Sequence, residues 1–256
     1  MKRLLVTFFT VLVLAGSAGA GYVQQFEKVE PAVWRLYVMG GGGDLFFLCS
    51  SWALGAEVEA AVVRDKSTLV TAGHCAAIAE ALGVEYRVTR DGKTFYEAKL
   101  KHTAMTATIN QGFSREDLLK VIRAGKWSPR QFSFITFSGE DWAILEIGVD
   151  GPRLVPDART PKIGTDLLMV GYPGGVAKMG TQGVFGTPSL FLPGEPWNGY
   201  FGYFLPSLGG SSGSPVVDAA SGRVIAIHVI GFVGSDIGGG TPIKLLVDGL
   251  EKLAKK

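Results

Sequence analysis

The sequence predicts an all-β fold that ends in one α-helix. Most of the chain after residue 20 divides into short runs rich in β-branched and aromatic residues, separated by glycine, proline and aspartate. Residues 242–254 differ, because their apolar side chains recur at helical spacing. The 256 residues are 47% hydrophobic and 19% charged, so the chain is long and apolar enough to form a packed core.

Residues 1–20 are predicted to be a signal peptide. Two basic residues precede a short apolar stretch, and Ala18-Gly19-Ala20 suits cleavage before Gly21. The apolar stretch is short for a membrane span, so a retained anchor is the less favoured alternative. The mature domain, residues 21–256, is expected to be secreted or periplasmic, with no stable membrane association.

The net charge bears on possible nucleic-acid binding, and the cysteine content bears on a disulfide or a metal site. The formal net charge is +2, and removing Lys2 and Arg3 brings it to about zero, so no electrostatic argument favours nucleic acid. Cys49 and Cys75 are the two cysteines, and an isolated pair in an exported protein often forms one disulfide. No spacing of cysteines and histidines suggests a metal site.

The first half of the chain is predicted to be mainly strands. They fall at residues 33–38, 45–48, 60–63, 68–71, 85–88 and 95–100. The glycine run at residues 40–43 predicts a flexible hairpin loop, and Asp91-Gly92 predicts a tight turn. Residues 101–137 have the character of a peripheral insertion, with a helix capped by Ser114, running through Ala124 and ending before Gly125.

The second half begins near Pro152. Its predicted strands fall at residues 167–172, 182–185, 199–204, 215–218 and 224–229. Residues 242–254 then form the predicted amphipathic C-terminal helix.

Three short segments carry candidate chemistry. Thr71-Ala72-Gly73-His74-Cys75 puts a histidine at a tight turn after a strand, where a general base could face a cleft. Asp141-Trp142-Ala143-Ile144-Leu145 puts a carboxylate at the start of a core strand. Gly209-Gly210-Ser211-Ser212-Gly213-Ser214-Pro215 puts hydroxyls on a glycine-rich loop just before a strand.

Each segment also has a plainer interpretation. His74 could be a packed histidine beside a structural disulfide, Glu140 could equally supply the strand-entry acid, and the serines could belong to a linker. The immediate strand pattern after Pro215 argues against a linker. An α/β-hydrolase is disfavoured, because its Gly-x-Ser-x-Gly elbow would need glycine where Ser214 stands.

The order of His74, Asp141 and Ser212, each in its local context, resembles the chymotrypsin-like (trypsin-like) serine proteases over roughly residues 26–254. The resemblance implies two six-stranded antiparallel β-barrels, at about residues 26–150 and 151–241, with a C-terminal helix at 242–254. It implies that Ser212 is the nucleophile, His74 the base and Asp141 its orienting acid. The amides of Gly210 and Ser212 would form the oxyanion hole, the substrates would be polypeptides, and no cofactor or metal is expected.

The motifs most resemble those of bacterial glutamyl endopeptidases. That resemblance implies a specificity pocket lined by Ser207 and His228, whose donors suit a Glu or Gln side chain before the scissile bond. His228 could instead simply end a core strand. Pro206 and Ser211 stand where digestive relatives carry aspartates, so neither a basic-residue pocket nor trypsinogen-like activation is expected.

Two alternatives stay open. HtrA-like proteases share the Gly-Tyr-Pro turn found at Gly171-Tyr172-Pro173, although they usually carry a further PDZ domain, and that kinship would imply cleavage after small apolar residues. A catalytically silent barrel that binds peptides is the alternative outside enzymes.

Overall fold

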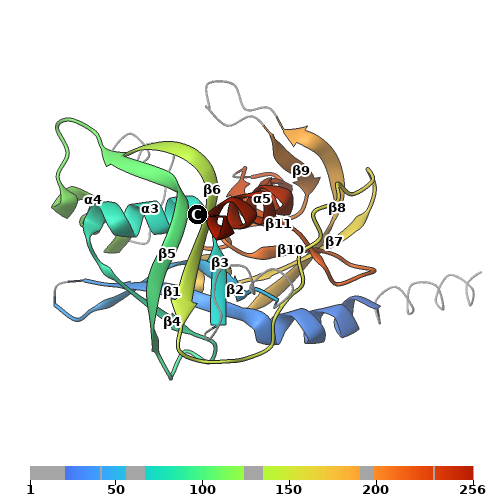
Figure 1. Cartoon of the computed structure of the whole chain (residues 1–256), viewed down its shortest axis with the longest axis horizontal. Coiled ribbons are helices and arrows are strands. Elements are labelled where there is room, and N and C mark those ends of the chain that lie inside the picture. Colours follow the sequence, from blue (N-terminus) through green and yellow to red (C-terminus); the bar gives the residue numbers. More distant parts are fainter. Residues whose placement is uncertain are drawn as a thin grey trace, which may run out of the picture.

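The computed structural model describes residues 21–40, 42–55, 67–123, 135–190, 199–232 and 234–255. Its strands close into two antiparallel β-barrels that lie side by side (Figure 1). The first has the strand order β1-β2-β3-β6-β5-β4, and the second has the order β10-β11-β12-β9-β8-β7. This confirms the prediction of two six-stranded antiparallel barrels with a C-terminal helix.

The elements have the following bounds. The first barrel contains β1 (Val33–Met39), β2 (Leu45–Ala53), β3 (Ser67–Thr71), β4 (Glu85–Thr89), β5 (Tyr96–Ile109) and β6 (Ile135–Ile147). The second contains β7 (Asp166–Gly171), β8 (Met179–Leu190), β9 (Tyr200–Phe204), β10 (Pro215–Asp218), β11 (Val224–Gly231) and β12 (Ile237–Pro242). The helical elements are residues 21–29, η1 (Glu30–Ala32), α3 (Gly73–Leu82), α4 (Arg115–Arg123), η3 (Pro173–Gly175) and α5 (Ile243–Ala254).

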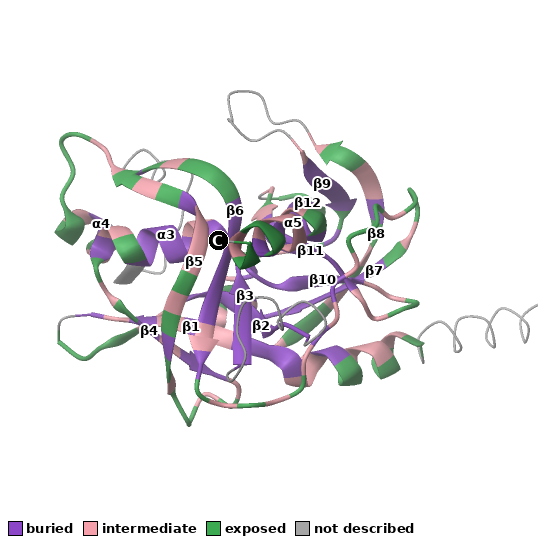
Figure 2. Cartoon of the chain, in the orientation of Figure 1, coloured by how far each residue is buried: buried purple, intermediate pink, exposed green. Residues whose placement is uncertain are grey.

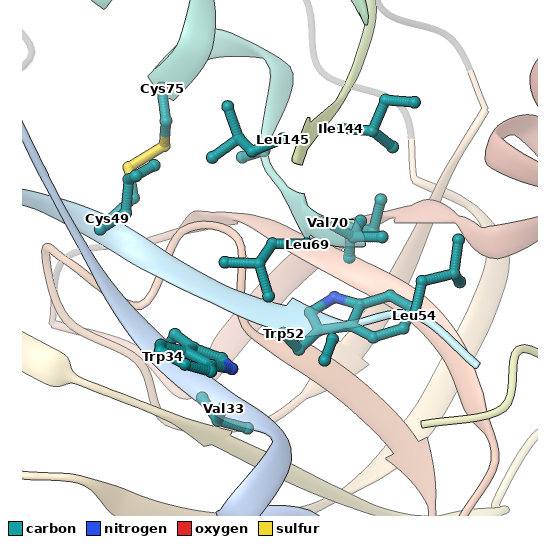
Figure 3. Close-up of a cluster of buried hydrophobic side chains, with 14 of the residues drawn as sticks. Val33, Trp34, Cys49, Trp52, Leu54, Leu69, Val70, Cys75, Ile144 and Leu145 are labelled. Atoms are coloured by element: carbon teal, nitrogen blue, oxygen red, sulfur yellow. A yellow bond between two sulfur atoms is a disulfide. The ribbon is translucent and has the colours of Figure 1, made fainter. Parts of the chain in front are cut away.

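Large apolar side chains fill the first barrel. Trp34 of β1 and Trp52 of β2 are fully buried, and they belong to one apolar cluster with Leu69 of β3 and Leu145 of β6 (Figure 3). Figure 2 shows that buried residues are found along strands of both barrels. Because each tryptophan buries a large apolar area, these side chains are a major source of the stability of the first barrel.

The C-terminal helix links the two barrels. Ile243, Leu246 and Leu250 form its buried face, as the helical spacing predicts. The helix contacts β11 and β12 of the second barrel. Its Gly249 lies so close to the ring of Trp142, on β6 of the first barrel, that a side chain there would overlap the ring. The helix therefore packs against both barrels.

The residues after 100 were expected to form a peripheral insertion, but many of them extend two strands of the first barrel. β5 continues to Ile109 and pairs with β6 from Ile135 onward, so these two strands form a long hairpin. The outer part of β5 is rich in threonine and alanine, and the outer parts of both strands are largely half-buried or exposed, so no run of buried apolar residues marks them in the sequence. The predicted helix is present as α4, and Ser114 and Asp117 form a reciprocal cap at its start.

The helix α3 was not predicted. It starts directly after Ala72 and ends at Gly83, which adopts the left-handed conformation (φ 57°) of a helix C-cap. Its Ile78 and Leu82 pack with Leu118 of α4 and with Ile135 in a separate apolar cluster. The insertion therefore supports the helix that carries His74.

Some predictions fall outside the described residues. They are the signal peptide at 1–20, the strand at 60–63 and the helix end at Gly125. Among the described residues, no helix combines the length and apolar character needed to cross a bilayer.

Cys49 of β2 and Cys75 of α3 are joined in a disulfide, which confirms the predicted pairing (Figure 3). The two cysteines are 26 residues apart in the sequence. Closing a loop of this length is expected to stabilise the fold by about 3–4 kcal/mol through the unfolded chain. Urea unfolding of a double Cys49→Ala, Cys75→Ala variant should show a loss of that size, and an unchanged midpoint would contradict it.

Candidate active site

His74 and Asp141 are joined by two hydrogen bonds. The Nδ1 atom of His74 lies 2.8 Å from Oδ2 of Asp141, and the backbone N–H of His74 donates to Oδ1 at 2.7 Å. The Asp141 side chain is 1% exposed and the His74 side chain 17%. A carboxylate only accepts, so Nδ1 carries a proton, and in the neutral ring the lone pair is therefore on Nε2. In this tautomer Nε2 of His74 can accept a proton.

Local backbone packing holds this pair together. A Cβ on Gly73 would lie 2.6 Å from the backbone nitrogen of Trp142, so the turn before His74 can approach β6 because residue 73 is glycine. Thr241 of β12 donates to the backbone carbonyl of Asp141 at 2.9 Å, which ties the acid to the second barrel.

The structure distinguishes the two neighbouring acids. Asp141 is buried inside β6, not at its start as predicted, because β6 begins six residues earlier at Ile135. Glu140 is exposed and accepts a hydrogen bond from Nε1 of Trp142 at 2.8 Å. Asp141 is therefore the acid that contacts His74.

The loop that carries Ser212 is held by its backbone. Ser211 N–H donates to Leu208 O at 3.0 Å, and Gly210 has φ 92°. A positive φ at the third position of this four-residue turn is the type II pattern, which favours glycine. The Ser212 carbonyl accepts from Ser50 N–H at 2.8 Å, and Gly213, with φ 84°, donates to the His228 carbonyl at 2.7 Å.

Ser212 and His74 belong to segments that pack together, although their side chains make no direct hydrogen bond among the described residues. Gly213 lies against the carbonyl of Ser50 and the hydroxyl of Thr71, three residues before His74. The hydrogen bond between a nucleophile and its base is often long in an unliganded enzyme.

Two backbone amides on this loop are available to a ligand. Within the described part of the chain, neither the N–H of Gly210 nor that of Ser212 donates to another residue. Both belong to the loop predicted to form an oxyanion hole.

His228 is buried and uncharged. It is 2% exposed, and its Nδ1 lies 2.8 Å from the hydroxyl of Tyr203 on β9. Burial lowers the pKa of His228 to about 3, and the charge of a protonated His74 also lowers it. Burial raises the pKa of the Tyr203 hydroxyl well above its ordinary value, so the phenol keeps its proton.

The contact with Tyr203 favours one tautomer of His228. A buried phenol proton needs an acceptor, and Nδ1 of His228 is the one side-chain partner of the Tyr203 hydroxyl among the described residues, so the tautomer in which the hydroxyl donates to Nδ1 is favoured. The proton of the neutral ring then resides on Nε2, which is a donor.

Ser207, the other predicted pocket residue, is not brought into contact with His228. Its hydroxyl lies against the backbone of Gly231. Ser207 also lines a cavity of about 420 Å³ whose walls are mainly apolar. The cavity lies between the loop before Ser212 and strands β7 and β8, and its lining includes Met169, Met179, Leu208 and Ser211.

One group of potential metal ligands among the described residues is Cys49, His74 and Cys75. Its two sulfurs are joined in the disulfide and are not thiolates, so they cannot act as ordinary metal ligands.

Sequence reasoning missed several residues of the site. Ser50 and Phe47 come from β2, Tyr203 from β9, and Gly174 from η3, all far from Ser212 in sequence except Tyr203. These residue types are common in strands and turns, so no local signal distinguishes them. Ser50 could have been suspected from its position next to Cys49.

Comparison with known proteins identifies the class. Residues 59–227 match the family model of the trypsin-like peptidase domain, which covers more than half of the chain. The chain therefore belongs to this family and is a trypsin-like serine protease that acts on polypeptides. No curated protein matches the sequence.

Solved structures share the fold at low sequence identity. A serine endoprotease from Yersinia pestis has a TM-score of 0.61 and 21% identity, over 92% of this chain and 67% of that one. The Rv3671c protease of M. tuberculosis, in its active form, has a TM-score of 0.59 and 18% identity, over 89% of this chain and 83% of that one. These similarities concern the fold alone.

Proposed function

We propose that this protein is an extracytoplasmic serine endopeptidase in which Ser212 is the nucleophile, His74 the general base and Asp141 the acid that orients His74. The double hydrogen bond between Asp141 and His74 carries the proposal. It places the proton of a neutral His74 ring on Nδ1, so the lone pair of that ring is on Nε2, the atom that must act as base.

The proposed reaction has two halves. Ser212 Oγ attacks the scissile carbonyl carbon while Nε2 of His74 takes the hydroxyl proton, and the oxyanion is bound by the amides of Gly210 and Ser212. Collapse of this intermediate breaks the C–N bond, and His74 gives the proton to the leaving amine. A water molecule then hydrolyses the acyl-enzyme by the same steps, with His74 as base and then as acid.

An extracytoplasmic location is supported by two features. The N-terminal sequence has the pattern of a signal peptide, and the disulfide between Cys49 and Cys75 suits an oxidising compartment. This location is part of the proposal.

The substrate residue before the scissile bond is proposed to be Gln in preference to Glu. Nε2–H of the buried His228 is an uncharged donor that suits a side-chain carbonyl oxygen. A carboxylate would have to lose its hydration without gaining a cation as partner, which is costly. A preference for small apolar residues is the competing proposal, and the apolar walls beside Ser207 favour it.

A panel of fluorogenic peptides tests both proposals. The peptides differ only in having Gln, Glu, Ala, Val or Lys before the scissile bond, and Ser212→Ala is the control for contaminating proteases. We expect cleavage after Gln to exceed cleavage after Glu, and we expect His228→Leu to lower kcat/KM for Gln about 10- to 100-fold, the value of one lost hydrogen bond in a buried site. Tyr203→Phe should lower kcat/KM less than His228→Leu does, because this change removes the hydrogen bond that restrains the tautomer but leaves the His228 ring in place.

Three other outcomes would contradict a part of the proposed function. Cleavage after Ala or Val that is unaffected by His228→Leu would contradict the Gln preference and favour the apolar pocket. Cleavage that persists in Ser212→Ala would contradict the assignment of the nucleophile. A failure to react with a serine-directed fluorophosphonate would favour a silent, peptide-binding barrel.

A further inference from the structure

Ser50 is a fully buried serine whose every polar group contacts the loops of the active site. Its N–H donates to the carbonyl of Ser212 at 2.8 Å, and its carbonyl accepts from the hydroxyl of Thr71 at 2.8 Å. Its hydroxyl donates to the carbonyl of Gly210 at 2.9 Å and accepts from the N–H of Tyr172 at 2.9 Å. One residue of the first barrel therefore binds two loops of the second.

The peptide groups on both sides of Gly210 are anchored by these contacts. The carbonyl of Gly209 accepts from Gly174 N–H at 2.6 Å. Because a trans peptide is planar, the N–H of Gly210 points opposite to that carbonyl, away from Gly174. The next peptide is anchored through the carbonyl of Gly210, which is held by Ser50. Rotation of either peptide would break one of these hydrogen bonds.

The second anchor comes from the Tyr172–Gly175 turn. Gly175 N–H donates to Tyr172 O at 2.9 Å, and Gly174 has φ 64° and ψ 5°, so Pro173-Gly174 forms a type II turn. The turn thus offers two N–H groups to the neighbouring segments: that of Gly174 to Gly209 and that of Tyr172 to Ser50.

Packing leaves little room for another arrangement. A Cβ on Gly175 would lie 2.5 Å from Cδ1 of Phe47, and a Cβ on Gly210 would lie 2.5 Å from Cε1 of the same ring. Phe47 belongs to β2, three residues before Ser50. The ring therefore touches the Tyr172–Gly175 turn and the loop of Gly210 together, while the Ser50 hydroxyl connects the same two segments.

We propose that Ser50 is a positioning residue for the oxyanion hole. Its hydroxyl fixes Gly210 so that the N–H of Gly210 already faces the position where negative charge develops on the substrate oxygen. A donor that is oriented in advance needs no reorganisation in the transition state, which is where such donors have their effect. The proposal rests on Ser212 being the nucleophile.

The test compares Ser50→Ala with Ser51→Ala. Both serines lie on β2 and are 0% exposed, but the Ser51 hydroxyl has no hydrogen-bond partner among the described residues. We expect Ser50→Ala to lower kcat about 10- to 100-fold, which does not exceed the fall in kcat expected when an oxyanion donor itself is removed. KM should change by no more than about twofold. Ser51→Ala should keep both constants within about twofold of the wild type. Ser50→Cys, with a weaker donor, should fall between wild type and Ser50→Ala.

A spectroscopic measurement distinguishes a role of Ser50 in positioning the oxyanion hole from a general loss of structure around it. The infrared stretch of the acyl-enzyme ester carbonyl reports the hydrogen bonds that its oxygen accepts. We expect the band to shift to higher frequency in Ser50→Ala and to stay in place in Ser51→Ala. An unchanged band, or equal losses of kcat in both alanine variants, would overturn the proposal. If Ser50→Ala does not fold, Ser50→Cys carries the same comparison.

The outcome can be separated from a failure of the proposed function. Absence of any Ser212-dependent cleavage by the wild type would contradict the proposed function, not the role of Ser50 in the loop. Crystal structures of wild type and Ser50→Ala would then decide the inference. A peptide between Gly209 and Gly210 that keeps its orientation without the hydroxyl would overturn it.

Discussion

Replacing Asp141 by asparagine is expected to lower kcat/KM by about 10⁴, with little change in KM. The two hydrogen bonds to His74 give the reason. The backbone N–H of His74 needs an acceptor, so the amide oxygen of the new side chain takes the place of Oδ1 and its NH₂ group takes the place of Oδ2. That NH₂ group faces Nδ1 of His74 as a donor, so the ring proton moves to Nε2. In that tautomer His74 cannot take the proton of Ser212.

Glu140→Gln is the matched control for this variant. Glu140 is adjacent in sequence and also acidic, but it is exposed and binds Trp142 instead of His74. We expect its kcat/KM to remain within about threefold of the wild type. Steady-state kinetics on one peptide substrate are sufficient. Equal losses in the two variants, or activity retained by Asp141→Asn, would show that Asp141 does not orient the base.

Acidification from pH 7 to pH 4 is expected to destabilise the folded protein by about 3 kcal/mol through His228 alone. The pKa of His228 is lowered to about 3 in the folded state by burial and then by His74. The unfolded chain takes up a proton below about pH 6.5, where an ordinary histidine titrates, while the folded chain stays neutral until about pH 3. The unfolded state therefore binds more protons in this window, and stability falls as the pH falls.

The measurement is urea unfolding at pH 7, 5.5 and 4 for the wild type and His228→Gln. Carboxylates whose pKa is lowered in the fold, such as those of Asp91 and Asp157, also lose stability in acid, but they do so in both proteins. The difference between the two stability curves isolates His228. The variant should lose less stability than the wild type, whereas parallel curves would show that His228 titrates normally.

Periodic burial explains which elements the sequence predicts well. β1 alternates buried and half-exposed residues, and α5 carries one apolar face, so both patterns are visible in the chain. β12 has neither pattern, because Gly238, Gly239 and Gly240 supply no side chains. A Cβ on Gly240 would lie 2.8 Å from the carbonyl of Ile227 on β11, so close strand packing requires the glycine.

The residues of the candidate site also differ in how well the sequence predicts them. The segments around His74, Asp141 and Ser212 are distinctive because glycines and short motifs surround the reactive groups. The supports of these groups are not distinctive, since they act across long stretches of chain. Ser50 contacts Tyr172 and Gly210, residues 122 and 160 positions away, and no local pattern encodes such contacts. Tyr203 likewise acquires its role when β9 folds beside β11.

The disulfide joins two segments of the proposed active site. Cys49 directly precedes Ser50, and Cys75 directly follows His74, so the bond connects the proposed support of the oxyanion loop to the segment of the proposed base. In a reducing compartment these positions would be separate thiols, and the newly made chain would lack this covalent tie. If the chain is exported as proposed, oxidation completes the fold after it has left the compartment where it was made. Proteolytic competence and export would then be linked in time.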